Sequence, residues 1–306
     1  MSGARSAPFF LPKVLRRIAF AAFVTAQACS ASDRPADQPV SRPAAWLKVP
    51  TNDTVIFNGV IDYDRAGVSM PQMLYPAPNI AGMFAAVLAH GLFIGSAKNA
   101  QKQKLQEEAD LVLAPYLPML NAYKYPELMQ TSLAHIDPPY NVKLLQMSST
   151  PAVAAVIIES APVFSITQDQ RALILDLAVA IGNTGAAEKY QAVLRVLSFP
   201  SDAEKMTEFW NDDEGRRLKR EAARLLATAL TATLDDRTKP TADNPLQTTV
   251  RYLEGGTEKT ERGQVLREQC GRALIRTLRG NLMSVPVKRA GPGNDTASCV
   301  DALIGN

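Results

Sequence analysis

The stretch that decides the fold runs from residue 173 to residue 181 and reads Leu-Ile-Leu-Asp-Leu-Ala-Val-Ala-Ile. Large aliphatic side chains alternate there with small or polar ones, which is the period of a β-strand with two different faces. One face carries Leu173, Leu175, Leu177, Val179 and Ile181, and the other carries Ala172, Asp176, Ala178 and Ala180. The alternation therefore predicts a strand inside a packed sheet.

A second apolar stretch, residues 190–199, follows the first after Gly182-Asn-Thr-Gly185. Glycine and asparagine between two β-rich stretches are typical of a hairpin with a longer loop. If the connection is symmetric, Asp176 faces Arg195 across the two strands. Such a pair is expected to contribute about 0.2 to 1 kcal/mol and to fix the register.

The remaining periodicities predict an α/β (α+β) fold, with one mixed sheet that contains an antiparallel hairpin. Further strands are expected at residues 54–62, 142–147, 153–158 and 247–254. A long Gly/Ala-rich helix from residue 80 to about 113 and a short helix at 126–134 are expected to pack with the sheet. Two amphipathic helices complete the prediction, one that starts at Asn211-Asp212-Asp213-Glu214 and one at 257–278. The small face of the strand at 173–181 is the expected seat of the Gly/Ala-rich helix.

The N-terminus has the pattern of a bacterial export signal. Basic residues (Arg5, Lys13, Arg16, Arg17) precede an apolar run from Ile18 to Ala26, and Ala26-Gln27-Ala28 offers a cleavage site before Cys29. Residues 1–28 are therefore predicted to be a signal peptide.

Cys29 leaves two fates open, and both lie outside the cytoplasm. The sequence Cys29-Ser30-Ala31-Ser32 resembles the start of a mature lipoprotein, although Ala26 stands where such signals prefer leucine. Lipid attachment at Cys29 is the preferred interpretation, and a soluble periplasmic protein is the alternative. By resemblance to lipoprotein sorting signals, Ser30 favours the outer membrane.

Prolines at positions 35, 39 and 43 predict a flexible tether at 29–50 ahead of a single domain at 51–306. Residues 245–306 could form a subdomain of their own. The apolar segment 80–97 could span a membrane, but His90 in its middle favours a buried helix.

Charge and cysteine content exclude some classes of protein. The chain has 33 basic and 30 acidic residues, and four basic residues belong to the signal, which leaves 29 against 30. A near-neutral chain is not typical of a nucleic-acid-binding protein. Cys270 and Cys299 are an even pair in an oxidising compartment and could form a disulfide, with two unpaired thiols as the alternative. The cysteine spacing predicts no metal site.

The usual catalytic patterns for nucleophilic serine, phosphate binding, dinucleotide binding and zinc hydrolysis are missing from the sequence, which predicts no cofactor. Whether the chain is an enzyme stays open, with a non-enzyme favoured. Hydrolysis by a carboxylate pair remains an alternative because such a pair is defined by its separation in space.

The C-terminal part is unusually basic. Between residues 262 and 289 lie seven basic residues (Arg262, Arg267, Arg272, Arg276, Arg279, Lys288, Arg289) against the single acid Glu268, and the five arginines fall in or near the predicted helix at 257–278. They could form a contact surface for anionic headgroups or an acidic partner. Alternatively, acids from elsewhere in the fold match them.

Arg251-Tyr-Leu-Glu-Gly-Gly256, Glu261-Arg-Gly263 and residues 276–286 resemble the C-terminal part of uncharacterised exported proteins and lipoproteins of proteobacteria. The resemblance implies an envelope location but no activity. The sequence therefore predicts a non-catalytic envelope protein that binds or assembles an envelope component, anchored to the membrane through Cys29. A periplasmic hydrolase and a soluble periplasmic binding protein are the alternatives, and the oligomeric state stays open.

Overall fold

The computed structural model describes residues 44–51, 53–61, 97–136, 139–145, 155–184, 189–238 and 245–287. All described residues belong to one compact unit, Ser41–Asn306. The predicted signal peptide and most of the segment 80–97 lie outside the described residues. Among the helices that are described, none is long and apolar enough to cross a membrane.

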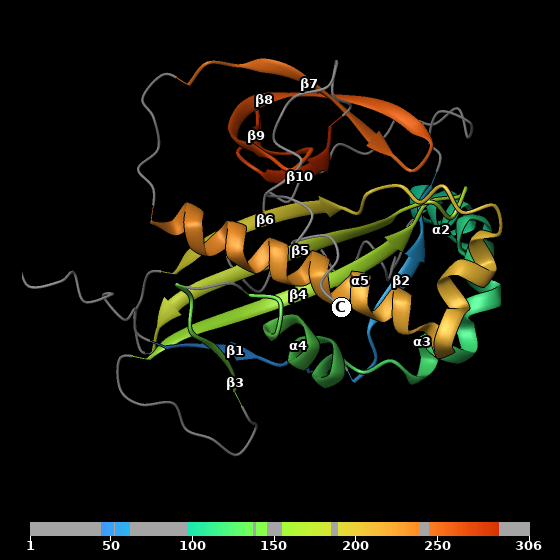
Figure 1. The fold of residues 1–306 in the computed structure, drawn as a ribbon, viewed down its shortest axis with the longest axis horizontal. Coiled ribbons are helices and arrows are strands. Elements are labelled where there is room, and N and C mark those ends of the chain that lie inside the picture. The colour runs from blue at the N-terminus through green and yellow to red at the C-terminus, as the bar shows by residue number, and fades with distance from the viewer. Residues whose placement is uncertain are drawn as a thin grey trace, which may run out of the picture. The chain divides into compact units, whose positions relative to one another are not determined.

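One mixed sheet of ten strands organises the unit, in the order β3-β1-β4-β5-β6-β10-β9-β8-β7, with β2 on β4 (Figure 1). The strands are β1 (Ala45–Lys48), β2 (Ile56–Gly59), β3 (Val142–Leu145), β4 (Val156–Ile166), β5 (Leu173–Asn183), β6 (Tyr190–Leu197), β7 (Thr248–Glu254), β8 (Thr257–Gln269), β9 (Arg272–Thr277) and β10 (Leu282–Pro286). Four α-helices, α2 (Ala97–Asp110), α3 (Leu117–Ala122), α4 (Tyr125–Leu133) and α5 (Met206–Arg237), and the 3-10 helix η1 (Leu111–Tyr116) are also described. The predicted α+β class with a mixed sheet is confirmed.

The hairpin at the centre of the sheet follows the predicted register. β5 and β6 are antiparallel, and Asp176 lies opposite Arg195. The guanidinium of Arg195 donates to both carboxylate oxygens of Asp176 at 2.7 Å each. The predicted hairpin is confirmed: the alternation of large and small side chains excludes a slip of one residue, and the symmetric connection gives the register that is observed.

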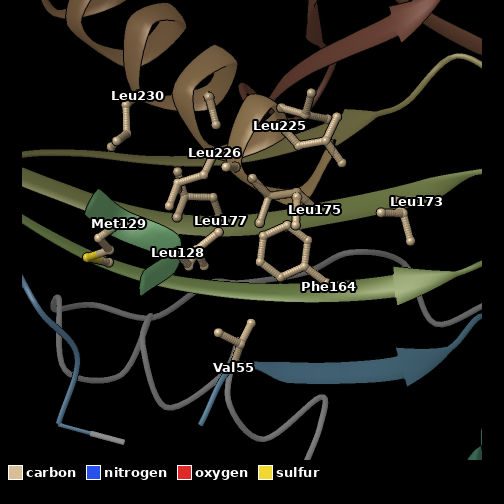
Figure 2. Packing of buried hydrophobic residues seen from close by; sticks show 14 of the residues in the cluster. Val55, Leu128, Met129, Phe164, Leu173, Leu175, Leu177, Leu225, Leu226 and Leu230 are labelled. Atoms are coloured by element: carbon tan, nitrogen blue, oxygen red, sulfur yellow. The ribbon is translucent and has the colours of Figure 1, made fainter. Parts of the chain in front are cut away.

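The large-residue face of β5 packs against α4 and α5 to form the main core. In Figure 2, Leu225, Leu226 and Leu230 of α5 approach Leu175 and Leu177 of β5. Leu128 and Met129 of α4 and Phe164 of β4 belong to the same buried cluster. Full burial of each such side chain stabilises the fold by about 1.5 to 3 kcal/mol. The predicted apolar stripe of the helix after 214 is therefore core.

Helix α5 contains a break where the sequence predicts a helix start. Asp213, Glu214 and Gly215 have φ angles of 56°, 57° and 77°, and the long regular part of the helix follows them. A Cβ on Gly215 would lie 2.7 Å from the side chain of Met119, so a glycine fits both the backbone and the space. The helical residues ahead of the break were not predicted.

The predicted tether at 29–50 is wrong at its C-terminal end. Residues 45–48 form β1, which lies between β3 and β4 in parallel register, with Leu47 fully buried. Four residues are too few to show a strand period by themselves, so the two neighbouring strands decide their conformation. β2 continues along the same edge of β4. The side chains of Gln106 and Asp110 in α2 form hydrogen bonds with the backbone of Gly59 and cover the outer edge of β2 at that residue.

The predicted helix at 257–278 is also wrong. These residues form β8 and β9, which pair with each other across a turn at Cys270 and Gly271. Helix propensity is a weak preference, and pairing with β7, β9 and β10 overrides it here. Only one of the two predicted amphipathic helices therefore exists, although the predicted strand at 247–254 is confirmed as β7.

Strands β7 to β10 curl into a second, smaller layer beside β6 (Figure 1). β10 is parallel to β6 and antiparallel to β9, and a bridge from Tyr252 to Val287 joins β7 to the residue after β10. The buried residues of this layer are Ile174, Leu197, Val250, Tyr252, Ala273, Ile275, Met283 and Val285. Because Ile174 and Leu197 come from β5 and β6, this cluster lies on the opposite face of the sheet from α5.

Candidate contact surface

The five arginines predicted to form one contact surface come from three different places. Arg262 and Arg267 lie in β8, Arg272 and Arg276 lie in β9, and Arg279 lies in the turn between β9 and β10. Because these residues are in strands, the helical spacing that would have aligned them does not apply. Three of the five, Arg267, Arg272 and Arg276, bind other groups of the same domain.

Arg267 and Arg276 hold the C-terminal end of α5. Arg267 lies 3.4 Å from Asp235, and Arg276 forms an ion pair with Asp236. Two acids at the carboxyl end of a helix are unfavourable for its dipole, and the two arginines offset that effect. Tyr140 and Tyr190 also donate to Asp235 and Asp236, so this cluster joins α5 to β8, β9 and β6.

Arg272 lies between the sheet and α5. Its guanidinium donates to the carbonyl of Leu197 at 2.6 Å and to that of Ser284 at 3.0 Å, and it lies 5.1 Å from the ring centre of Phe199. Burial lowers the pKa of Arg272 to about 10, against the opposing effect of Glu221. Burial also raises the pKa of Glu221, although Arg224, Arg272 and Arg220 act in the opposite direction.

On the other face of the sheet, four charges alternate in sign. Asp176 and Arg195 form the central pair, and Glu261 of β8 interacts with both Arg195 and Arg279. Burial raises the pKa of Glu261, and the two arginines partly counter it. The sequence predicted the first pair but not its extension to Glu261, because that contact depends on the curl of β8 over the sheet.

Arg262 and Arg279 are exposed, and two leucines of the same C-terminal region are exposed as well. Leu246 precedes β7 and Leu278 follows β9, with 86% and 61% of their surface accessible. The contact surface stays a prediction, and of the five arginines Arg262, Arg267 and Arg279 are exposed. Leu246 and Leu278 were missed by the sequence analysis, because an isolated leucine in a polar stretch carries no signal of exposure.

Sequence analysis also missed the turn between β4 and β5, which ties several elements together. Asp169 accepts hydrogen bonds from the hydroxyl of Thr167 at 2.5 Å, the N–H of Arg171 at 3.0 Å and the N–H of Gly256 at 2.6 Å. Burial opposes ionisation of Asp169, but these hydrogen bonds outweigh it and hold its pKa below the usual value. In the same turn Gln170 has a φ of 58° and accepts from Trp210 through its carbonyl.

Of the three cysteines, the structure describes only Cys270. Cys270 is disulfide-bonded, in the turn between β8 and β9. Cys29 and Cys299 lie outside the described residues, so lipid attachment at Cys29 and the pairing of Cys270 with Cys299 stay predictions. Within the described ranges, no group of three or more histidine, cysteine or acidic side chains could hold a metal ion.

Comparison with known proteins adds little. No protein-family model matches the chain, and no curated protein does. A solved structure described as the crystal structure of an uncharacterised protein is similar at 9% identity and a TM-score of 0.24, over 63% of this chain and 92% of the other. A TM-score at this level carries no argument about function.

Proposed function

We propose that this chain is a non-catalytic protein of the bacterial cell envelope that acts by binding or assembling another envelope component. Residues 1–28 direct its export, and a lipid on Cys29 holds it at a membrane, with the outer membrane favoured by Ser30. The support for export is the order of basic residues, apolar run, small residues and Cys29 at the N-terminus. Acyl chains at Cys29 would bury many methylene groups in the bilayer.

The observation that carries the non-catalytic part is the use of carboxylates in the described residues. Asp169 joins two turns of the fold, Asp176 pairs with Arg195, and Asp235 and Asp236 bind arginines and tyrosines. Glu159 of β4 pairs with Lys48 at 3.2 Å and with Lys189 at 2.7 Å. A general acid or base needs oxygens that can reach a substrate. These carboxylates instead bond groups of the fold itself, which supports a structural use over hydrolysis by an acid pair.

The test of the anchor is substitution of Cys29. Wild-type protein is expected in the membrane fraction, with the mass of a chain that starts at Cys29 plus its acyl groups. The Cys29→Ser variant has no thiol to acylate and is expected in the soluble periplasmic fraction. Cell fractionation and intact-mass measurement check both statements, and Ser32→Ala in the same segment is the matched control that keeps the wild-type distribution.

Two outcomes would contradict the proposal. A Cys29→Ser variant that stays with the membrane would mean that another segment provides the anchor. A soluble, unacylated wild-type protein would favour the soluble periplasmic binding protein instead.

A further inference from the structure

We infer that a small-residue surface of the central sheet, here called the alanine lane, is covered by residues 80–96 of the same chain. The alanine lane consists of five buried residues on the face of β4, β5 and β6 that points away from α5 (Ala161, Val163, Ala178, Ala180 and Val193). The inference goes beyond the proposed function, because it concerns the packing of the folded domain and does not depend on a lipid at Cys29.

Strand register places these five residues on one face of the sheet. Ala178 of β5 pairs with Ala161 of β4 and with Val193 of β6, so the three form a row across the sheet. Val163 lies two positions after Ala161 along β4, and Ala180 lies two positions after Ala178 along β5. Side chains at paired and at alternate positions point to the same side of a sheet. The alanine lane is therefore one continuous surface.

The burial of the alanine lane requires a cover. Ala178 and Ala180 are 0% exposed, and the other three residues are at most 7% exposed. Helices α4 and α5 pack on the opposite face, where the large side chains of β5 point (Figure 2). Of the residues that the structure describes, two hydrophobic clusters are buried, and neither includes a member of the alanine lane. Its cover is therefore a part of the chain outside the described ranges.

The chain leaves the described fold beside this face. Val60, the residue after β2, packs against the cluster of Ile174 and Leu197, which lies on the same side of the sheet as the alanine lane. The next described residue after 61 is Ala97, so the 35 residues 62–96 are available between them. Seventeen of these in a helix would be about 26 Å long, and the other 18 reach about 60 Å when extended. The connection is therefore long enough to cross the three strands and return to α2.

The composition of residues 80–96 fits the alanine lane. The segment has four alanines, three glycines and no aspartate, glutamate, lysine or arginine. Short side chains on both surfaces allow a close approach, and the apolar contact removes both surfaces from water. Asp176, which borders the lane, already accepts two hydrogen bonds from Arg195, so an apolar cover does not leave its carboxylate unpaired. A segment that covers the lane is not available to span a membrane.

Residues 288–306 are another stretch that starts beside this face, because Val287 also packs against the cluster of Ile174 and Leu197. Their sequence includes Lys288, Arg289, Pro292, Asp295 and Asp301. Charged side chains are costly to bury against alanine and valine without partners. Residues 80–96 are therefore the better cover.

The experiment places the photoreactive residue p-benzoylphenylalanine at Gln191 of the full-length exported protein. Gln191 pairs with Ala180 and is exposed, so the probe lies at the border of the alanine lane without filling it. Irradiation of cells, followed by proteolysis and mass spectrometry, is expected to identify crosslinks to residues 80–96. The matched control carries the probe at Arg237, an exposed residue at the C-terminal end of α5, and should give no crosslink to that segment.

Hydrogen exchange provides a second measurement that needs no probe. The amides of residues 80–96 should exchange slowly in the wild-type protein. Ala178→Leu overfills the alanine lane and is expected to accelerate their exchange by about tenfold. Ala114→Leu, at an exposed position of η1, is the matched control and should leave it unchanged. Crosslinks from Gln191 to residues 288–306, to another protein or to no part of 80–96 would overturn the inference, as would fast exchange of 80–96 in the wild-type protein.

Discussion

The central strands β4 to β6 and the C-terminal strands β7 to β10 belong to one sheet, but their sequences encode it in different ways. β4, β5 and β6 follow one another in the chain and pair as sequential antiparallel neighbours. Along β5 every second residue from Leu173 to Ile181 is large and aliphatic, and these residues share one face. β8 has charged or polar residues at most of its 13 positions. A strand can therefore be specified by its own pattern, as β5 is, or by its partners, as β8 is.

The difference has a geometric origin in β8. The residues before Gly263 pair with β7, and those after it pair with β9, with a register shift between Val265 and Arg267. A strand that changes partner and bends at a bulge exposes different faces along its length. Its side-chain pattern therefore has no constant period of two, and the charged stretch was interpreted as a helix.

The substitutions with the largest expected effect on the free energy of unfolding test whether the two regions unfold together. Leu177→Ala in β5 and Ile275→Ala in β9 remove side chains that are fully buried. Each is expected to lower the free energy of unfolding by about 2 to 5 kcal/mol. Both variants should keep a single transition, because Ile174 and Leu197 of the central strands lie in the same cluster as Ile275.

Urea unfolding followed by circular dichroism and by tryptophan fluorescence measures this prediction, with hydrogen exchange to locate the opened strands. A separate, earlier transition of β7 to β10 in the Ile275→Ala variant would contradict it. That result would favour the alternative in which residues 245–306 are a subdomain.

An effect no larger than these is expected at the contact between the two regions. Arg272→Met removes a guanidinium that bonds Leu197 and Ser284 and faces Glu221. Because its partners would be left without a donor, the variant should lose about 3 kcal/mol of unfolding free energy. Arg262→Met, at an exposed position of β8, is the matched control and should change it by less than about 0.5 kcal/mol. Equal losses in the two variants would show that Arg272 is a surface residue in solution.

The smallest expected effects are on how stability depends on pH. The contributions of Asp169 and Glu261 to the stability at neutral pH have opposite signs. The pKa of Asp169, in the turn between β4 and β5, lies below its usual value, so its ionised form stabilises the fold. That contribution is present above about pH 4, the usual value of a free aspartate, and disappears as the pH falls through the lower pKa of the folded state. The pKa of Glu261 in β8 is raised instead. Its ionisation costs stability at neutral pH, and the cost disappears as the pH falls through the raised pKa towards about 4.3.

Asp169→Asn is therefore expected to be less stable than wild type at pH 7, with a smaller difference at acidic pH. Glu261→Gln is expected to be slightly more stable at pH 7, with a gain that also vanishes on acidification. Urea midpoints measured across the acid range check both. Parallel shifts of the two variants at every pH would show that neither carboxyl group is perturbed in the folded state.

The sequence by itself determined the features that depend on neighbouring residues. The alternation in 173–181 defined β5 and, with Gly182 and Gly185 beyond it, the hairpin and the pair Asp176–Arg195. The apolar stripe of α5 and the short helix α4 were also readable, because an amphipathic period reports which face will be buried. The five arginines could be identified as a group, but their roles could not.

Only the tertiary structure decided the rest. β1 has four residues and becomes a strand because β3 and β4 lie on either side of it. Arg267, Arg272 and Arg276 come near Asp235, Glu221 and Asp236 of α5 only after β8 and β9 have formed, and the sequence does not distinguish them from Arg262 and Arg279. Such pairings join residues that are more than 30 positions apart. Local sequence carries no information about them, because their free energy is gained only when distant segments pack together.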